Sequence, residues 1–168
     1  MPLWKIHHPA GAYSDADKQE FAEAITGIYT QIPIPAFYVV TIFEEVDGNN
    51  IYVGGRSHER FVRIQVDQMA RTLPGSVIRE WWVHTLDEKI KPFVGDRGYD
   101  WEFTCSELPA DLWSLQGIVP PPFSSMAEKR WVTENKALAY GQSEMLPASF
   151  VAAAENGEVL LAPGIRGG

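Results

Sequence analysis

A strand–helix–strand pattern occurs twice in this chain, in copies that start about 60 residues apart, and this repetition constrains the fold more than any other feature. In the first copy, residues 2–8 and 36–46 have the apolar, β-branched and aromatic composition of strands. Between them, a capping box begins at Ser14 and is followed by apolar residues at helical spacing. The expected helical stripe consists of Phe21, Ile25, Ile28 and Ile32. The first copy is therefore predicted to be a β-α-β unit within residues 2–55.

The second copy, within residues 61–108, follows a turn signal and a short strand at residues 47–55. Residues 61–67 alternate between apolar and polar side chains, as in a strand with one buried face. A helix is expected to start at Thr72-Leu73-Pro74, and residues 99–105 are expected to form the closing strand. The candidate buried stripe of this helix is Val83, Leu86, Ile90 and Phe93. The pattern predicts an α+β fold made of two consecutive β-α-β units.

The remainder of the chain has a different composition. The prolines of residues 117–122 favour an extended segment, and Ser124-Ser125 is expected to cap a short helix that carries Met126, Arg130 and Trp131. We therefore assign residues 1–138 to one domain and residues 139–168 to a C-terminal extension. Within this extension, Val159-Leu160-Leu161 is a candidate edge strand.

Composition and charge limit the classes of partner. The 168 residues suit a single domain, and the formal net charge of -8 disfavours binding to nucleic acid or to an anionic membrane surface. Neither a membrane-spanning apolar run nor a signal-peptide core is evident. Because Cys105 is the only cysteine, an internal disulfide is impossible, which fits a reducing compartment. We expect a cytoplasmic protein.

The second residue, Pro2, could take part in acid–base chemistry that an internal proline cannot perform. Removal of Met1 would leave a secondary amine at the amino terminus, and such an amine titrates at a pKa of about 8. A group with this pKa serves readily as a general acid or base near neutral pH. The alternative is that Pro2 only permits trimming of Met1 and starts a strand.

Several segments together resemble the tautomerase superfamily, and within it the cis-3-chloroacrylic acid dehalogenase-like branch and its oxalocrotonate tautomerase relatives. The similarity covers residues 2–137, and its strength lies in the order and spacing of the segments rather than in any one of them. The matching segments are Pro2 on its strand, Ala22-Glu23-Ala24-Ile25-Thr26, Ile51-Tyr52-Val53-Gly54-Gly55, Met69-Ala70-Arg71 and Ser106-Glu107-Leu108-Pro109.

The resemblance implies that the two units share one mixed sheet with both helices on one face. It also implies a homotrimer that needs neither metal nor cofactor and acts on a small carboxylate substrate. In this family the amino-terminal proline is the acid or base, which corresponds to Pro2, and arginines hold the substrate carboxylate, a role that falls on Arg71. The sheet face without helices is expected to be apolar and buried between subunits. Arg71 has a simpler alternative as an exposed arginine at a helix start.

Other family positions differ in this chain. A histidine of the dehalogenases falls on Tyr29, which either donates a hydrogen bond into the site or belongs to the core. Their active-site tyrosine falls on or beside Thr104, and the glutamate that activates water with it falls near Leu115. Trp113 is a candidate wall of the pocket, with ordinary packing as the alternative. Without the glutamate, the proline and the arginine still meet the minimum for enol–keto tautomerisation.

The histidines do not support a metal site. His7 and His8 are adjacent on a strand and point to opposite faces, and His58 and His84 lack ligand partners at suitable spacing. The leading hypothesis is thus a tautomerase with Pro2 as general acid/base. The alternatives are a cis-3-haloacrylate dehalogenase or hydratase, a trimer of this family that binds an anion without catalysis, and an unrelated α+β ligand-binding domain.

Overall fold

The structure, a computed structural model, describes residues 2–69 and 71–156. In this part of the chain, the main sheet has the strand order β2-β1-β5-β6. Strands β1 and β2 are parallel, as are β5 and β6, and the two pairs meet at the antiparallel β1–β5 ladder. The bounds of these strands are β1 Pro2–Pro9, β2 Val40–Val46, β5 Phe61–Gln68 and β6 Asp100–Glu107. The predicted pair of β-α-β units in one mixed sheet is confirmed.

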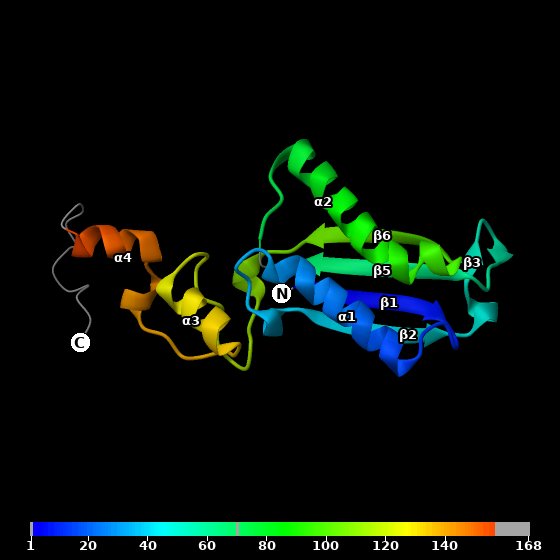
Figure 1. The fold of residues 1–168 in the computed structure, drawn as a ribbon, viewed down its shortest axis with the longest axis horizontal. Helices are drawn as coiled ribbons and strands as arrows, with labels where there is room; N and C mark the ends of the chain where they lie inside the picture. Colours follow the sequence, from blue (N-terminus) through cyan, green and yellow to red (C-terminus); the bar gives the residue numbers. More distant parts are fainter. Residues whose placement is uncertain (1, 70, 157–168) are drawn as a thin grey trace.

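Helices α1 (Asp15–Thr30) and α2 (Gly75–Ile90) lie on the same face of the sheet, as predicted (Figure 1). The capping box at Ser14 is present, with Asp17 as its acidic partner. The β1 side chains that point towards the helices, Trp4, Ile6 and His8, are completely buried. A short hairpin, β3 (Tyr52–Val53) and β4 (Arg56–Ser57), connects the two units. These elements also bear out the expected turn after β2.

Three details of the helices and strands differ from the sequence predictions. Ile32 lies beyond the end of α1 and is exposed, while Tyr29 completes the buried stripe. In α2 the buried residue is Trp82 and not Val83, because Trp82 lies four positions before Leu86 on the same helix face. Residues 36–38 form a 3-10 helix, η1 (Ala36–Tyr38), so the strand begins only at Val40.

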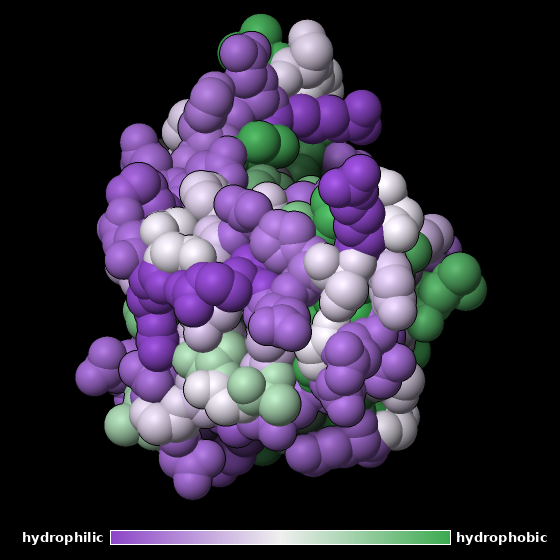
Figure 2. Space-filling view, turned by 90° about the vertical axis from the view of Figure 1, so that its right-hand side faces the viewer, coloured by the Kyte–Doolittle hydropathy of each residue, from purple (hydrophilic) through white to green (hydrophobic). Residues whose placement is uncertain are grey.

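The sheet face without helices is mixed rather than apolar, so that expectation was wrong. Strand alternation places charged side chains of β1, β5 and β6 on this face. Arg63 Nε lies 3.1 Å from a carboxylate oxygen of Glu102, and His7 Nδ1 lies 2.9 Å from one of Glu44. The end of the molecule that carries the β3–β4 hairpin is also largely hydrophilic (Figure 2).

The C-terminal segment lies beyond the other end of the sheet (Figure 1). It contains α3 (Met126–Glu134), capped by Ser125 as predicted, and α4 (Ala148–Glu155). Trp131 of α3 is buried against Tyr38 of η1, with ring centroids 6.0 Å apart. The candidate strand at Val159-Leu160-Leu161 lies outside the described residues. No helix in the described part of the chain has the length and hydropathy needed to span a membrane.

Candidate active site

The strand directions bring the predicted acid/base and the predicted carboxylate ligand to the same end of the sheet. Because β1 and β5 are antiparallel, the first residue of β1, Pro2, lies opposite Gln68 near the end of β5. Arg71 follows Gln68 by three positions. Pro2 is buried at this end, which faces α3 in Figure 1. The candidate site therefore lies where β1 starts and where β5 and β6 end.

A cavity of about 350 Å³ lies at this end of the molecule and is lined by both Arg71 and Trp113. Two of the four residues predicted for the site thus meet in one cavity. Most of the wall is aromatic or proline, so an entering ligand would contact mainly apolar side chains. The other lining residues are Tyr38, Ala110, Asp111, Val119, Pro120, Pro121, Pro122, Phe123, Glu128, Tyr140 and Met145.

The Arg71 guanidinium is enclosed by charged, polar and aromatic groups. Its Nη2 donates to a carboxylate oxygen of Glu128 at 3.1 Å and to the carbonyl oxygen of Pro33 at 3.4 Å. Its central carbon lies 3.7 Å from the ring centroid of Phe123, a cation–π distance. Burial lowers the pKa of Arg71, and the carboxylate of Glu128 beside it acts in the opposite direction. The side chain is 16% exposed, which contradicts the alternative of a solvated arginine.

Glu128 is a buried acid that the sequence analysis did not identify. Its side chain is 5% exposed, and its second carboxylate oxygen accepts a hydrogen bond from the backbone N–H of Ser124 at 2.7 Å. The Glu128 backbone N–H in turn donates to the Ser125 hydroxyl at 3.1 Å. Ser125 and Glu128 have capping-box spacing, and this signal alone could have placed the acid in the first turn of a helix.

Tyr38, which also escaped prediction, presents a buried hydroxyl at the cavity wall. The residue is 2% exposed, and its ring packs edge-on against Trp113 at 4.6 Å between centroids. Among the described residues, none forms a hydrogen bond with the Tyr38 hydroxyl. Burial raises the pKa of this hydroxyl, and so does the nearby carboxylate of Glu128, against a smaller opposite effect of Arg71. Tyr38 is therefore a protonated, buried hydrogen-bond donor.

Tyr29 lies in the core and not at the cavity. Its side chain is completely buried, and its hydroxyl oxygen accepts a hydrogen bond from the indole N–H of Trp4 at 3.0 Å. Its ring meets Trp82 edge-on at 5.6 Å between centroids. This arrangement favours the core alternative for Tyr29 over a contact with substrate.

The two other positions identified from the family, Thr104 and Leu115, place neither a carboxylate nor a tyrosine side chain at this cavity. The Thr104 hydroxyl accepts a hydrogen bond from Arg63 at 2.9 Å, and strand alternation puts it on the helix-free face of the sheet. Leu115 is an apolar residue that packs against the core. In the described ranges, no cluster of three or more histidine, cysteine or acidic side chains is arranged to hold a metal ion.

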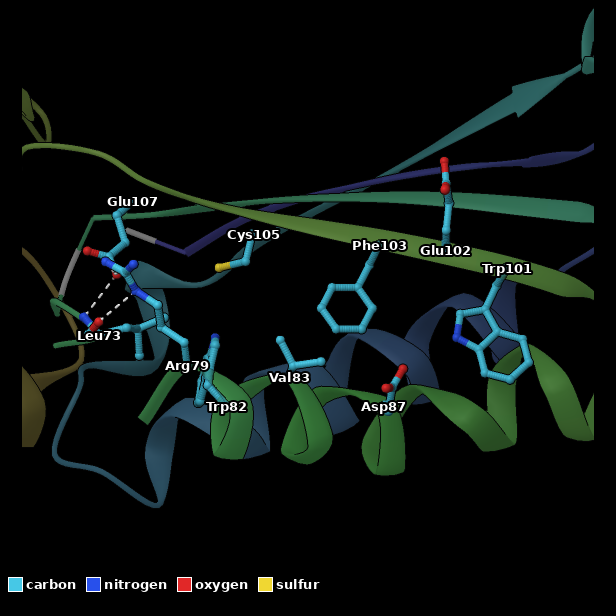
Figure 3. A pocket seen from close by; sticks show the side chains of 10 residues that line it. All are labelled: Leu73, Arg79, Trp82, Val83, Asp87, Trp101, Glu102, Phe103, Cys105 and Glu107. Carbon is cyan, nitrogen blue, oxygen red and sulfur yellow. Dashed lines mark hydrogen bonds and ion pairs between the residues drawn. The ribbon is translucent and has the colours of Figure 1, made fainter. Parts of the chain in front are cut away.

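A second cavity, of about 620 Å³, opens between α2 and β6 (Figure 3). At one end, Arg79 donates from Nε to the carbonyl oxygen of Leu73 at 3.0 Å and lies 3.6 Å from the carboxylate of Glu107. Trp82, Phe103 and Cys105 form apolar walls, and Glu102 points away from the cavity. The Arg79–Glu107 pair is more exposed than the Arg71–Glu128 pair, and the indole N–H of Trp82 is a buried donor without a hydrogen-bond partner among the described residues.

Comparisons with known proteins agree with this fold. The model of the family described as "Putative oxalocrotonate tautomerase enzyme" matches residues 1–136. A crystal structure of a variant of RhCC from Rhodococcus jostii is 41% identical, with a TM-score of 0.82, and the match covers 90% of this chain and 99% of that one. Among curated proteins, none matches this chain.

Two further structures extend the comparison. A protein described as "a probable enzyme" from the fungus Aspergillus fumigatus is 34% identical, with a TM-score of 0.78 and coverage of 83% of this chain and 98% of that one. A member of the cis-3-chloroacrylic acid dehalogenase family is 18% identical, with a TM-score of 0.63 and coverage of 92% of this chain and 99% of that one. At that identity, the second structure supports the fold alone.

Proposed function

Because this chain belongs to the oxalocrotonate tautomerase family of the tautomerase superfamily, we propose that it is a cofactor-independent tautomerase of small 2-keto or enol carboxylates. The observation that supports the proposal is that Pro2 and Arg71 belong to the same end of the sheet, although Pro2 is not among the residues that line the Arg71 cavity. Such a reaction needs one group that moves a proton between oxygen and carbon, and positive charge near the enolate that develops.

Pro2 is the proposed general acid/base. Once Met1 is removed, its nitrogen is a secondary amine at the start of β1, where the β1–β5 ladder fixes the position of the chain. The amine takes the proton from one end of the enol system and returns it at the other, so no cofactor or external base is consumed. Retention of Met1 would convert this nitrogen into an amide and abolish the mechanism.

Arg71 is the proposed ligand of the substrate carboxylate, and Trp113 the proposed wall that packs against the substrate. A guanidinium presents planar donors that match a carboxylate. Trp113 lies in the same cavity, together with the proline-rich residues 120–122. Hydration or dehalogenation is less well supported, because Leu115 stands where the resemblance places the water-activating acid.

The homotrimer and a cytoplasmic location belong to the proposal as well. Several large apolar side chains are exposed on one subunit and could be covered by a partner. Examples are Val77 and Trp81 of α2 and Leu112, Val119 and Phe123 between β6 and α3. Self-association through these surfaces would bury them, whereas the mixed helix-free face of the sheet would contribute polar contacts.

The first experiment is the ketonisation of phenylenolpyruvate by protein whose intact mass shows that Met1 is absent. Replacement of Pro2 by Ala also allows removal of Met1 but substitutes a primary amine for the secondary one. We expect kcat/KM to fall by about 10²-fold or more, the usual contribution of a positioned general acid/base. The matched control is Pro9→Ala at the other end of β1, which should retain the wild-type rate.

Equal rates for the wild-type protein and Pro2→Ala would contradict the assignment of Pro2. If neither protein accelerates ketonisation but chloride is released from cis-3-chloroacrylate, the dehalogenase alternative replaces the tautomerase. If neither reaction is accelerated, the non-enzymatic trimer becomes the better account.

A further inference from the structure

Glu128 forms an ion pair with Arg71, the residue proposed to bind the substrate carboxylate. One of its carboxylate oxygens lies 3.1 Å from Arg71 Nη2, inside the cavity, and the other accepts from Ser124 N–H. A substrate carboxylate would seek the same donors of Arg71. Two carboxylates beside one guanidinium repel each other strongly when both are buried. One donor nitrogen of Arg71 is therefore already bonded to an acid of the protein itself.

Resting on the proposed function, we infer that Glu128 is a built-in competitor of the substrate carboxylate, which binds by displacing Glu128 from Arg71. The ligand class is a small carboxylate that carries a second oxygen acceptor, as a 2-keto acid does. Glu128 thus sets the affinity and selectivity of the site without taking part in proton transfer.

The backbone beside Glu128 is suited to such a displacement. Ser124 has a φ of 60°, a left-handed conformation that is costly for a residue with a Cβ. The hydrogen bond from Ser124 N–H to Glu128 helps to hold this conformation. Strained residues of this kind persist only while their surroundings impose them, so release of Glu128 would also relax the turn.

The displaced carboxylate has a favourable place to go. Glu128 lies in the first turn of α3, whose N-terminus carries partial positive charge, and it can stay close to that end without Arg71. The rest of α3 remains anchored, because Trp131 is buried against Tyr38 and the Asn135 side chain accepts a hydrogen bond from Phe37 N–H at 2.9 Å. The Phe123 ring that covers Arg71 is 59% exposed, so its movement loses little packing.

The Tyr38 hydroxyl is an independent sign that a ligand completes this cavity. It is a buried donor, and the described residues offer it no acceptor, a costly arrangement that is rare in folded proteins. A ligand oxygen next to the carboxylate would accept this hydrogen bond. Tyr38 and Arg71 line the same cavity, so a 2-keto acid would engage the guanidinium with its carboxylate and the hydroxyl with its keto oxygen.

The test is the binding of pyruvate, measured by calorimetry and by the change in tryptophan fluorescence expected from Trp113. Glu128→Gln keeps an acceptor for Ser124 N–H but removes the negative charge. We expect pyruvate to bind this variant about tenfold more tightly than the wild type, which corresponds to about 1.4 kcal/mol. Binding of pyruvamide, which lacks the carboxylate, should change much less. The matched control is Glu134→Gln on the same helix, with wild-type affinity for pyruvate.

Glu128→Asp provides a second variant that retains the charge at the helix N-terminus, in case Glu128→Gln does not fold. Its shorter side chain cannot reach Arg71 and Ser124 together, so it should also bind pyruvate more tightly than the wild type. Unchanged affinity in the folded variants would overturn the inference. Weaker binding would overturn it as well, and would show that Glu128 positions Arg71 for the substrate.

The same titration distinguishes failure of this inference from failure of the proposed function. Pyruvate binding by Arg71→Ala should be lost if Arg71 is the carboxylate ligand. Loss in Arg71→Ala with no gain in Glu128→Gln would refute the competitor and leave the proposed function intact. Undiminished binding by Arg71→Ala would instead refute the assignment of Arg71 itself.

Discussion

Replacing Tyr29 by Phe tests whether this residue is part of the core or of the active site. The substitution deletes one hydroxyl and leaves the ring in place. In the wild type, this hydroxyl accepts the indole N–H of Trp4 at 3.0 Å, and both side chains are completely buried. After the substitution, the Trp4 N–H has lost its acceptor in a place that water does not reach.

The expected cost follows from that lost acceptor. A buried donor without a partner destabilises a folded protein by about 1–3 kcal/mol. In a chain of this length, each kcal/mol lowers the unfolding temperature by about 2–4 °C. We therefore expect the unfolding temperature to fall by about 2–12 °C, while kcat and KM for phenylenolpyruvate stay at their wild-type values.

Thermal unfolding followed by circular dichroism, at one fixed protein concentration, measures the effect. The matched control is Tyr52→Phe, because Tyr52 is exposed on β3 and its change should leave the unfolding temperature unaltered. The core assignment of Tyr29 is refuted if Tyr29→Phe unfolds like the wild type but loses most of its kcat/KM, since the hydroxyl would then serve the substrate.

Two other predictions concern stability. Gly95→Ala places a Cβ 2.7 Å from the Trp101 ring and should destabilise the protein by about 1–3 kcal/mol in chemical denaturation. The control is Gly27→Ala in α1, where the new Cβ meets no atom within 4 Å and should stabilise the protein by about 1 kcal/mol. Similar effects of the two substitutions would contradict the packing at Gly95. Burial lowers the pKa of His8 from its ordinary value of 6.5, so the unfolded chain binds a proton more readily than the folded one. The stability that depends on neutral His8 should therefore be fully present above pH 6.5 and decline as the pH falls below it. Between pH 7 and pH 5, the denaturation midpoint of His8→Asn should change less with pH than that of the wild type. An equal pH dependence in the two proteins would be evidence against this role of His8.

Features that depend on neighbouring positions in the chain were predictable from the sequence. The Ser14 cap is confirmed because its partner Asp17 lies only three positions away, with Asp17 N–H donating to the Ser14 hydroxyl at 3.2 Å. Alternation in β5 likewise identified Val62, Ile64 and Val66 as its buried face. Resemblance then supplied what periodicity cannot, namely how the two β-α-β units join.

Contacts between residues that are far apart in the sequence were not predictable. Arg71 and Glu128 are separated by 57 positions, and their pairing depends on the irregular path of residues 108–125. Nothing in local spacing reports such a contact. Trp82 was missed for a different reason: one residue of error in helix phase rotates the expected face by about 100°, which was enough to select its neighbour Val83 instead.

The candidate site joins two parts of the chain that are held in place by different forces. Pro2 is fixed by backbone hydrogen bonds of the β1–β5 ladder, which change little when a side chain is replaced. Glu128 is held by side-chain contacts to Arg71 and to the strained turn at Ser124, and these can be exchanged for contacts to a ligand. On our proposal, substitutions at Glu128 should therefore alter which carboxylates bind while the proton-transfer step keeps its dependence on Pro2. A change at Glu128 that altered kcat but left carboxylate affinity untouched would mean that the two parts are not separable in this way.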